Sequence, residues 1–345
     1  MNVQVAFGVG VFGAVLAASV YVLWGPEKLL RRRGRCAGLR NLGNTCFMNA
    51  VLQALASAGS LVEWLQVSCR GRLTSALQQT LKCLCKDDDG EVVCPGSIVQ
   101  ALASHGWSLD FQQQDAHELY HLFLTCLAEE KVNCPSLLAE PPPLLNSLQG
   151  SQYVAYGQAG PIPSLSASTT TLCPLQGLLA SELVCLSCQQ VCSLHSCLLD
   201  FIKSEAVSDV ECSACSKLAG SQVKRTFMKR LSLAHFPRIL CLHLKRTIWL
   251  PSGNLHKCDV SVAFPSQLDL SFICKTGRKG CRYELVAMIE HLGGLFSGHY
   301  VTYRQLQRGQ WVYTSDTAVY NSSLHQVLNS NPYMLLYQRV TLTNA

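Results

Sequence analysis

The chain has 345 residues, of which 48% are hydrophobic and only 14% are charged. An average soluble protein is roughly 25% charged, so this composition excludes a disordered chain and argues against a nucleic-acid-binding protein with a broad basic surface. The net charge of +6 is concentrated at the N-terminus, because residues 1–35 carry five basic side chains and one acidic side chain.

The N-terminal segment, residues 1–35, is predicted to be a membrane anchor. No residue from Val5 to Trp24 is charged, and twenty helical residues span roughly 30 Å, the thickness of the hydrocarbon core of a bilayer. A cleavable signal peptide would carry basic side chains before the apolar run, whereas residues 1–4 have none. A buried core helix is the other alternative, but the basic cluster that follows the run favours a membrane span.

The positive-inside rule places residues 36–345 in the cytosol, where cysteines stay reduced and serve as metal ligands or nucleophiles more often than in disulfides. One short span with a basic flank suits the mitochondrial outer membrane, and it also suits the peroxisome or the endoplasmic reticulum.

Residues 36–345 are predicted to form one α+β domain. A helix is expected over residues 43–58 with Thr45 as its N-cap, and a second helix is expected after Asp115. Residues 140–174 are rich in Pro, Ser, Gly and Gln and read as a loop. Strands are expected beyond about Phe227, at residues 239–244, 283–290, 300–304, 311–314 and 334–337. Helices first and strands last, with a cysteine-rich insert between them, is an α+β pattern.

The insert contains a predicted zinc site. Six of the nineteen cysteines fall between residues 185 and 215, and four of them form two CxxC pairs: Cys185, Cys188, Cys212 and Cys215. Two such pairs complete a tetrahedral set of four thiolates for one structural zinc ion, whereas a single pair would be typical of a redox site. Cys192, His195 and Cys197 lie between the pairs as possible substitutes, although small core or loop residues are the simpler interpretation.

Cys46 is a candidate nucleophile because it opens the first predicted helix, whose positive N-terminal dipole favours a thiolate. His299 follows a Gly/Ser-rich turn and is the candidate base. Ser315 and Asp316, at the end of the next predicted strand, are candidates for the group that orients the imidazole. A buried helix cysteine and an unrelated histidine remain the alternatives on composition alone.

Three segments together resemble the ubiquitin-specific protease family, a group of papain-like cysteine deubiquitinases. Residues 38–49 (GLRNLGNTCFMN) and 293–303 (GGLFSGHYVTY) look like its two signature boxes, and residues 113–119 (QQDAHEL) look like an intermediate box. The paired CxxC motifs resemble its zinc knuckles. The similarity runs from about residue 37 to 340 and implies a fold of thumb, palm and fingers, with the fingers at about residues 175–225.

The resemblance also implies roles for individual residues. Cys46 would attack the carbonyl carbon of ubiquitin's last glycine, and His299 would act as general base and then general acid. Asn41 matches the family's oxyanion-hole side chain. Asp115 and Gln113 match the box that contacts the ubiquitin tail; Asp115 capping the following helix is the alternative interpretation, and it does not exclude that contact.

At the third catalytic position most of the family has Asp or Asn where this chain has Ser315, so Ser315 is expected to orient His299 and Asp316 to lie near the oxyanion or the histidine. The span, its basic flank and this serine resemble family members anchored in the mitochondrial outer membrane. The expected activity is therefore removal of ubiquitin from mitochondrial outer-membrane proteins, which would oppose mitophagy. The alternative is an inactive ubiquitin-binding adaptor of the same fold. Zinc is the only metal expected, with no catalytic cofactor and no nucleic-acid partner.

Overall fold

The computed structural model describes residues 36–68, 71–86, 91–109, 114–132, 173–175, 192–229, 236–250, 252–273, 281–295, 297–306 and 309–340. The predicted anchor, Gln113, the first CxxC pair and most of the predicted loop at 140–174 lie outside these residues.

The described helices lie mainly in the first half of the chain. They are α2 (Cys46–Leu55), α3 (Gly59–Val67), α4 (Arg72–Leu84), α5 (Gly96–Ala103), α6 (Ala116–Val132), α7 (Leu194–Phe201), α8 (Ser213–Ala219) and α9 (Leu324–Leu328), with a 3₁₀ turn at Ser271–Ile273. The described strands are β1 (Gly38–Leu39), β2 (Val92–Val93), β3 (Cys192–Ser193), β4 (Glu205–Glu211), β5 (Lys224–Lys229), β6 (Ile239–His243), β7 (Thr247–Trp249), β8 (Leu255–Lys257), β9 (Val262–Ala263), β10 (Gln267–Asp269), β11 (Arg282–Gly293), β12 (Gly298–Gln305), β13 (Trp311–Ser315), β14 (Ala318–Ser322) and β15 (Met334–Arg339).

The α+β fold class predicted from the sequence is confirmed. The two predicted helices are α2 and α6, and the five predicted strands are β6, β11, β12, β13 and β15. Helices α3, α4 and α5 and strand β14 were not predicted. Among the described residues, no single helix is long and apolar enough to cross a membrane; α2 and α3 pass that test only together, across a bend of 87°.

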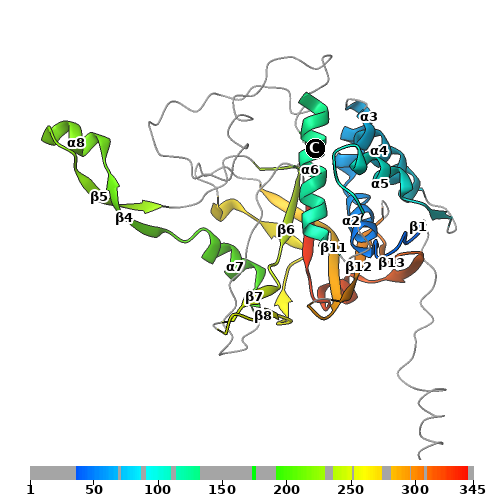
Figure 1. Ribbon diagram of the computed structural model, residues 1–345. Coiled ribbons are helices and arrows are strands. Elements are labelled where there is room, and N and C mark those ends of the chain that lie inside the picture. The colour runs from blue at the N-terminus through cyan, green and yellow to red at the C-terminus, as the bar shows by residue number, and fades with distance from the viewer. Residues whose placement is uncertain are drawn as a thin grey trace, which may run out of the picture.

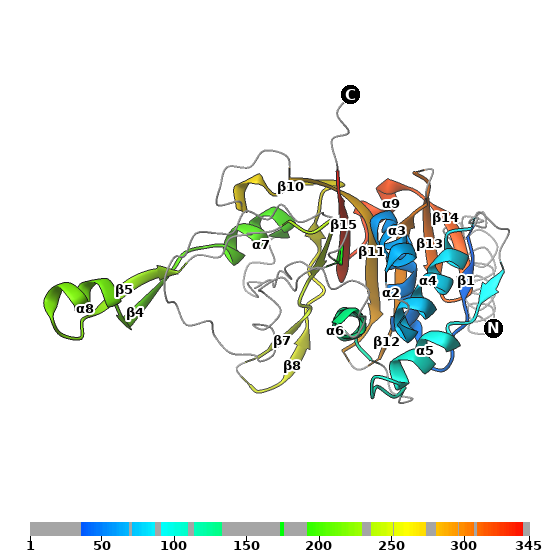
Figure 2. The ribbon, with the colours of Figure 1, turned by 90° about the horizontal axis from the view of Figure 1, so that it is seen from above.

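A seven-stranded sheet forms the centre of the fold. Its strands run in the order β14-β13-β12-β11-β15-β6, and β10 also pairs with β11. The pairings in this sheet are antiparallel, with His299 opposite Leu292 across β11 and β12 and Ser315 opposite Ala318 across β13 and β14. Figure 2 shows α2–α5 gathered on one side of the molecule, beside β12 and β13.

Strands β6 and β15 are buried on both faces over their first four residues, so these stretches read in the sequence as apolar runs. Alternate side chains of a strand point to opposite faces of the sheet. Each face of this sheet contributes to a separate hydrophobic core. The core shared with α2 and α6 takes Ile239 and Cys241 of β6 and Met334 and Leu336 of β15. The core shared with α7 takes Leu240 and Leu242 of β6 and Leu335 and Tyr337 of β15.

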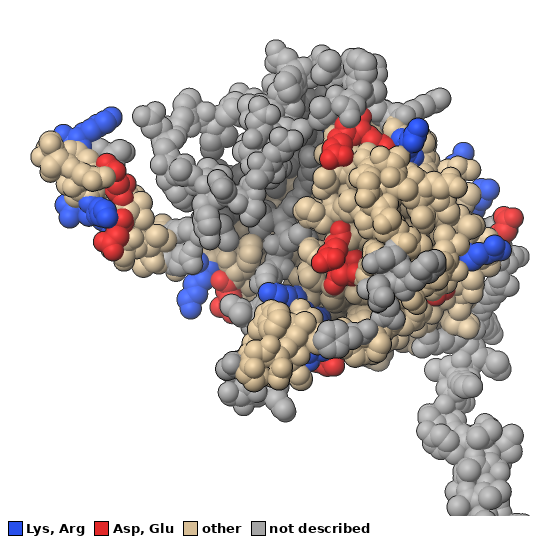
Figure 3. Space-filling view, viewed as in Figure 1, with Lys and Arg blue, Asp and Glu red and all other residues tan. Residues whose placement is uncertain are grey.

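Strands β4 and β5 and helix α8 form an arm that extends away from the sheet (Figure 1). The two strands pair antiparallel, from Glu205 opposite Lys229 to Glu211 opposite Lys224. Charged side chains of both signs lie on this arm, whereas uncharged residues dominate the rest of the described surface on the face shown in Figure 3. That face has no broad basic patch among its described residues, in line with the low charged fraction of the chain.

Helix α2 begins at Cys46, directly after the predicted N-cap Thr45, and ends at Leu55, three residues before the predicted end. The preceding residues Gly43 and Asn44 have φ angles of 100° and 53°, so they form a left-handed turn that cannot continue into a helix. Thr45 occupies the N-cap position, but its side chain makes no capping bond to the helix. The predicted capping role of Thr45 is therefore wrong, because its hydroxyl instead bonds to the loop that precedes the helix, at Leu42 N and Asn41 Oδ1.

Candidate active site

Cys46 lies at the first position of α2 and is only 5% exposed. Burial raises the pKa of its thiol, and the nearby Asp316 carboxylate acts in the same direction. Backbone N–H groups of Tyr300, Phe47 and Cys46 itself oppose this rise. The N–H donors at the start of α2 thus act in the direction expected of a helix N-terminus, but burial has the larger effect on the pKa. The thiol needs a base to become a nucleophile.

His299 lies near the start of β12, directly after the turn that joins β11 to β12. Its Nε2 atom lies 2.8 Å from Ser315 Oγ. The turn is tight because two glycines close it: Gly293 has a φ angle of 114°, and a Cβ atom at Gly298 would come within 2.6 Å of the Leu292 carbonyl oxygen. The Gly-rich segment that precedes His299 thus sets where the imidazole enters the site.

Ser315 and Asp316 lie at the end of β13 and in the following turn, and the two side chains have different partners. Ser315 contacts His299, whereas the Asp316 carboxylate accepts hydrogen bonds from Asn41 Nδ2 at 2.9 Å and Asn49 Nδ2 at 2.8 Å. Asp316 adopts a φ angle of 50°, a conformation that Asp tolerates better than most side chains. The serine is thus beside the imidazole, and the aspartate is beside the two amides.

Asn41 is held in one orientation by contacts on both ends of its amide. Its Oδ1 accepts bonds from the backbone N–H of Gly43 at 2.9 Å and of Thr45 at 3.1 Å, and from the Thr45 hydroxyl at 3.2 Å. Its Nδ2 donates to the Asp316 carboxylate. Three donors on one end and a carboxylate on the other fix which atom is oxygen and which is nitrogen. The second N–H of Nδ2 takes no part in these bonds.

Asp115 does what the alternative interpretation of the sequence expected, since it caps α6. Its Oδ1 accepts a bond from His117 N at 2.7 Å, and its Oδ2 accepts a bond from the Tyr333 hydroxyl. Burial raises the pKa of Tyr333, and the Asp115 carboxylate adds to this rise. Gln113, the second predicted substrate-binding residue, lies outside the described residues.

The sequence analysis missed the role of Asn49, which lies one helical turn after Cys46. Asn49 and Gln53 are 2% exposed amides, four residues apart on a helix whose other residues are mostly apolar. Their i, i+4 spacing puts them on one face. Two buried amides on one face of an apolar helix are a signal that polar partners must come from elsewhere in the chain.

Half of the predicted zinc set lies within the described residues. Cys212 is the N-cap residue of α8, and Cys215 lies in the first turn of that helix, at the tip of the β4–β5 arm. The pair therefore shares one tight turn, as a zinc knuckle requires. Cys185 and Cys188 lie outside the described residues.

The family described as "Ubiquitin carboxyl-terminal hydrolase" matches residues 37–337, nearly the whole part of the chain that follows the predicted anchor. The chain belongs to this family. It is accordingly a cysteine-type ubiquitin hydrolase, a deubiquitinase of the ubiquitin-specific protease type.

Relatives with similar length support the family assignment. Ubiquitin carboxyl-terminal hydrolase 30 of Xenopus tropicalis is 28% identical to this hydrolase, over 96% of this chain and 87% of the relative. The Homo sapiens protein of the same name is also 28% identical, over 96% of this chain and 90% of the relative. Among solved structures, Ubp8 in the SAGA DUB module bound to monoubiquitin has a TM-score of 0.59 at 21% identity, over 99% of this chain and 76% of that chain. This last likeness shows the fold of the hydrolase.

The contact between Asp316 and Asn41 yields a prediction for the hydrolase. If Asn41 donates to the oxyanion, as the family resemblance implies, Asn41→Ala should lower kcat by about 100- to 1,000-fold, the usual cost of losing one such donor. Asp316→Ala is expected to lower kcat about tenfold, mainly because the Asn41 amide loses its anchor. In the Asn41→Ala background the Asp316→Ala change should therefore cost less than tenfold. The measurement is a double-mutant cycle on a ubiquitin C-terminal fluorogenic ester or amide.

Asp269→Ala is the control for the loss of a surface carboxylate, because Asp269 lies on β10 and bonds to Ser271. Full additivity of Asn41→Ala and Asp316→Ala would contradict the proposed action of Asp316 through Asn41.

Proposed function

We propose that this deubiquitinase is anchored in a membrane and hydrolyses the isopeptide bond that follows ubiquitin's C-terminal glycine. The observation that carries the proposal is the 2.8 Å contact between His299 Nε2 and Ser315 Oγ, on a strand whose next residue, Tyr300, directs its backbone N–H toward Cys46. A thiol, an imidazole and a polar orienting group are the parts that nucleophilic cysteine catalysis needs.

In the acylation step His299 acts as the base. With Nε2–H donating to the Ser315 oxygen, Nδ1 is the ring nitrogen that carries the lone pair. Nδ1 takes the proton of the Cys46 thiol as the sulfur attacks the glycine carbonyl carbon. The resulting imidazolium then gives that proton to the departing lysine amine, and a thioester between Cys46 and ubiquitin remains.

In the deacylation step His299 takes a proton from water, which attacks the thioester carbonyl, and returns the proton to the Cys46 sulfur. Both steps pass through a tetrahedral oxyanion. We assign the second N–H of Asn41 Nδ2 as a donor to that oxyanion. The bonds to Asp316 and to the Thr45 loop occupy Oδ1 and the first N–H of Nδ2, and they leave the second N–H for this role. A preorganised donor of this kind stabilises the transition state by about 3 kcal/mol.

Ser315 orients the imidazole without adding a charge. A hydroxyl accepts the Nε2–H bond, but it stabilises an imidazolium less than a carboxylate does. Burial also raises the pKa of the Cys46 thiol, which makes transfer of its proton to His299 a necessary part of the attack.

The remaining site residues have binding or structural roles in the proposal. Asp115, rigid through its bonds to α6 and Tyr333, contacts the ubiquitin tail together with Gln113. Cys185, Cys188, Cys212 and Cys215 hold one zinc ion, which would close the tip of the arm that grips ubiquitin. A zinc ion with four protein thiolates has no open position for chemistry, so its role is structural.

The substrates we propose are ubiquitinated proteins of the mitochondrial outer membrane, so that the activity opposes mitophagy. The support is the uncharged run from Val5 to Trp24, the basic cluster after it and the serine at position 315. This topology keeps the catalytic domain, residues 36–345, on the cytosolic side.

A ubiquitin probe with a C-terminal electrophile tests the enzyme mechanism. The wild-type chain should form a covalent adduct, Cys46→Ala should form none, and Cys94→Ala should label like wild type because Cys94 is an exposed cysteine outside the site. Mass spectrometry of the adduct is the measurement. A wild-type chain that binds ubiquitin without forming an adduct would support the inactive adaptor instead.

The assignment of Ser315 predicts a ranking of two variants. Ser315→Ala should lower kcat by about 100-fold, since a misplaced imidazole costs roughly that factor, and Asp316→Ala should lower it about tenfold. Ser315→Asp should retain activity, because a carboxylate also accepts the Nε2–H bond. Steady-state kinetics with a fluorogenic ubiquitin substrate measures all three, and a larger loss for Asp316→Ala than for Ser315→Ala would reverse the assignment.

The anchor is tested by fractionation of cells. A chain that starts at Arg35 should leave the mitochondrial membrane fraction and appear in the soluble fraction, because it lacks the apolar run. The full chain with Cys46→Ala is the control and should stay with the membranes, since it keeps that run. Membrane retention of the shortened chain would show that residues 1–34 are not the anchor.

A further inference from the structure

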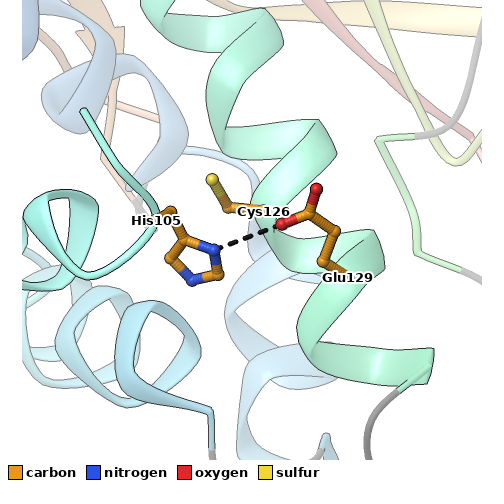
Figure 4. Close-up of side chains that lie close together, drawn as sticks. All are labelled: His105, Cys126 and Glu129. Atoms are coloured by element: carbon orange, nitrogen blue, oxygen red, sulfur yellow. Dashed lines mark hydrogen bonds and ion pairs between the residues drawn. The ribbon is translucent and has the colours of Figure 1, made fainter.

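A second group of ionisable side chains lies at the other end of α6 from Asp115. His105 follows α5, and its Nδ1 atom lies 3.2 Å from Glu129 Oε2 while its Nε2 atom lies 3.2 Å from Glu130 Oε1. Cys126 lies on α6 one turn before Glu129, and its sulfur points to the same side as the imidazole (Figure 4). One ligand atom each from His105, Cys126 and Glu129 lies within 4.8 Å of the other two.

The spacing of the three atoms suits one metal ion. In a tetrahedral zinc site with bonds of 2.0–2.3 Å, neighbouring ligand atoms are roughly 3.4–3.8 Å apart. The His105 Nδ1 to Glu129 Oε2 separation of 3.2 Å is slightly shorter than that range, so the two side chains would move apart a little to hold the ion. The side chain of Glu129 is 57% exposed, so it can adjust, whereas Cys126 is 2% exposed and is fixed by its packing. The exposed carboxylate also leaves a path to solvent.

Glu130 fixes the orientation of the imidazole. Its carboxylate accepts bonds from Leu73 N at 2.6 Å, Thr74 N at 2.8 Å and the Thr74 hydroxyl at 2.7 Å, at the start of α4. This acceptor receives Nε2–H of His105 and leaves the lone pair of Nδ1 directed toward Cys126 and Glu129. A carboxylate bonded to the outer nitrogen is the usual support of a metal-binding histidine.

The rival explanation is a protonated His105 that bridges two carboxylates. That ion pair accounts for Glu129 and Glu130 but assigns nothing to Cys126.

We propose that His105, Cys126 and Glu129 bind a zinc ion, with solvent as the fourth ligand and Glu130 as the group that positions His105. Sulfur and imidazole ligands select zinc over magnesium or calcium, which prefer oxygen alone. The ion joins the C-terminal half of α6 to the turn after α5 and, through Glu130, to the start of α4. It shares no residue with the set around Cys46, so we assign it no part in the reaction at Cys46.

Zinc content per chain tests the site on the purified full-length protein, dialysed against a zinc buffer and measured by plasma mass spectrometry. Glu129→Gln and Cys126→Ala should each bind one zinc ion fewer than wild type. The matched controls are Glu118→Gln, a carboxylate on the same helix, and Cys83→Ala, a thiol on the neighbouring helix α4, and both should bind as many as wild type. A wild-type zinc content in Glu129→Gln and Cys126→Ala would overturn the proposal.

A second measurement reports the sulfur ligand directly. A chain with Cys185→Ser, Cys188→Ser, Cys212→Ser and Cys215→Ser lacks both CxxC pairs of the arm but keeps the site at α6. Added Co²⁺ should still give a thiolate-to-cobalt charge-transfer band in this chain, with the intensity of a single sulfur ligand. The band should disappear when Cys126→Ala is added. Absence of the band before that change, or its persistence after it, would overturn the proposal.

Discussion

The position of the nucleophile relative to the base depends on how strand β12 holds helix α2. His299 is the second residue of the strand. Further along the same strand, the side chains of Thr302 and Arg304 form hydrogen bonds to the helix. The Thr302 hydroxyl donates to the Ala50 carbonyl at 2.9 Å, and Arg304 Nη1 donates to Gln53 Oε1 at 2.7 Å. Arg304 is 1% exposed, and its other terminal nitrogen donates to the Leu84 carbonyl at 2.9 Å. A buried guanidinium without these partners would cost several kcal/mol. The helix therefore has one favourable position on the sheet, and Cys46 is placed by it.

The turn after β13 adds the remaining parts of the site to this frame. Ser315 contacts the imidazole, while Asp316 binds the amides of Asn41 and Asn49 and its backbone oxygen accepts a bond from Leu39 N at 2.8 Å. One carboxylate thus connects the N-terminal strand, the loop before the nucleophile and helix α2. Since that carboxylate is committed to the amides, a neutral hydroxyl is left to orient His299. The two neighbouring residues therefore have separate partners, and this accounts for a serine at the position where the family usually has Asp or Asn.

The sequence predicted those parts of the fold that local patterns encode. The apolar runs of β6, β11 and β15 identify buried strands, and the motif around Cys46 identifies the family. The bond between Asn41 and Asp316 joins residues 275 positions apart, and no periodicity carries such information. The capping bond expected of Thr45 was wrong because its hydroxyl bonds to Leu42 and Asn41 in the preceding loop, and no local pattern encodes that loop. The group at His105 was not foreseen either, because its residues come from two elements without the short spacing of a CxxC pair.

Strand β1 fixes the start of the described chain to the catalytic domain. The length of the segment before it therefore limits how far the domain can lie from the proposed membrane anchor. Leu39 is bonded to the Asp316 turn, and Cys36 just before it is 1% exposed, so the described chain is fixed to the catalytic domain from its first residue. Twelve peptide units separate Cys36 from Trp24, the last residue of the apolar run. Even fully extended they reach only about 40 Å. If that run lies in a bilayer, as we propose, Cys36 lies within about 40 Å of the lipid surface, and the catalytic domain can act on ubiquitin attached close to that surface.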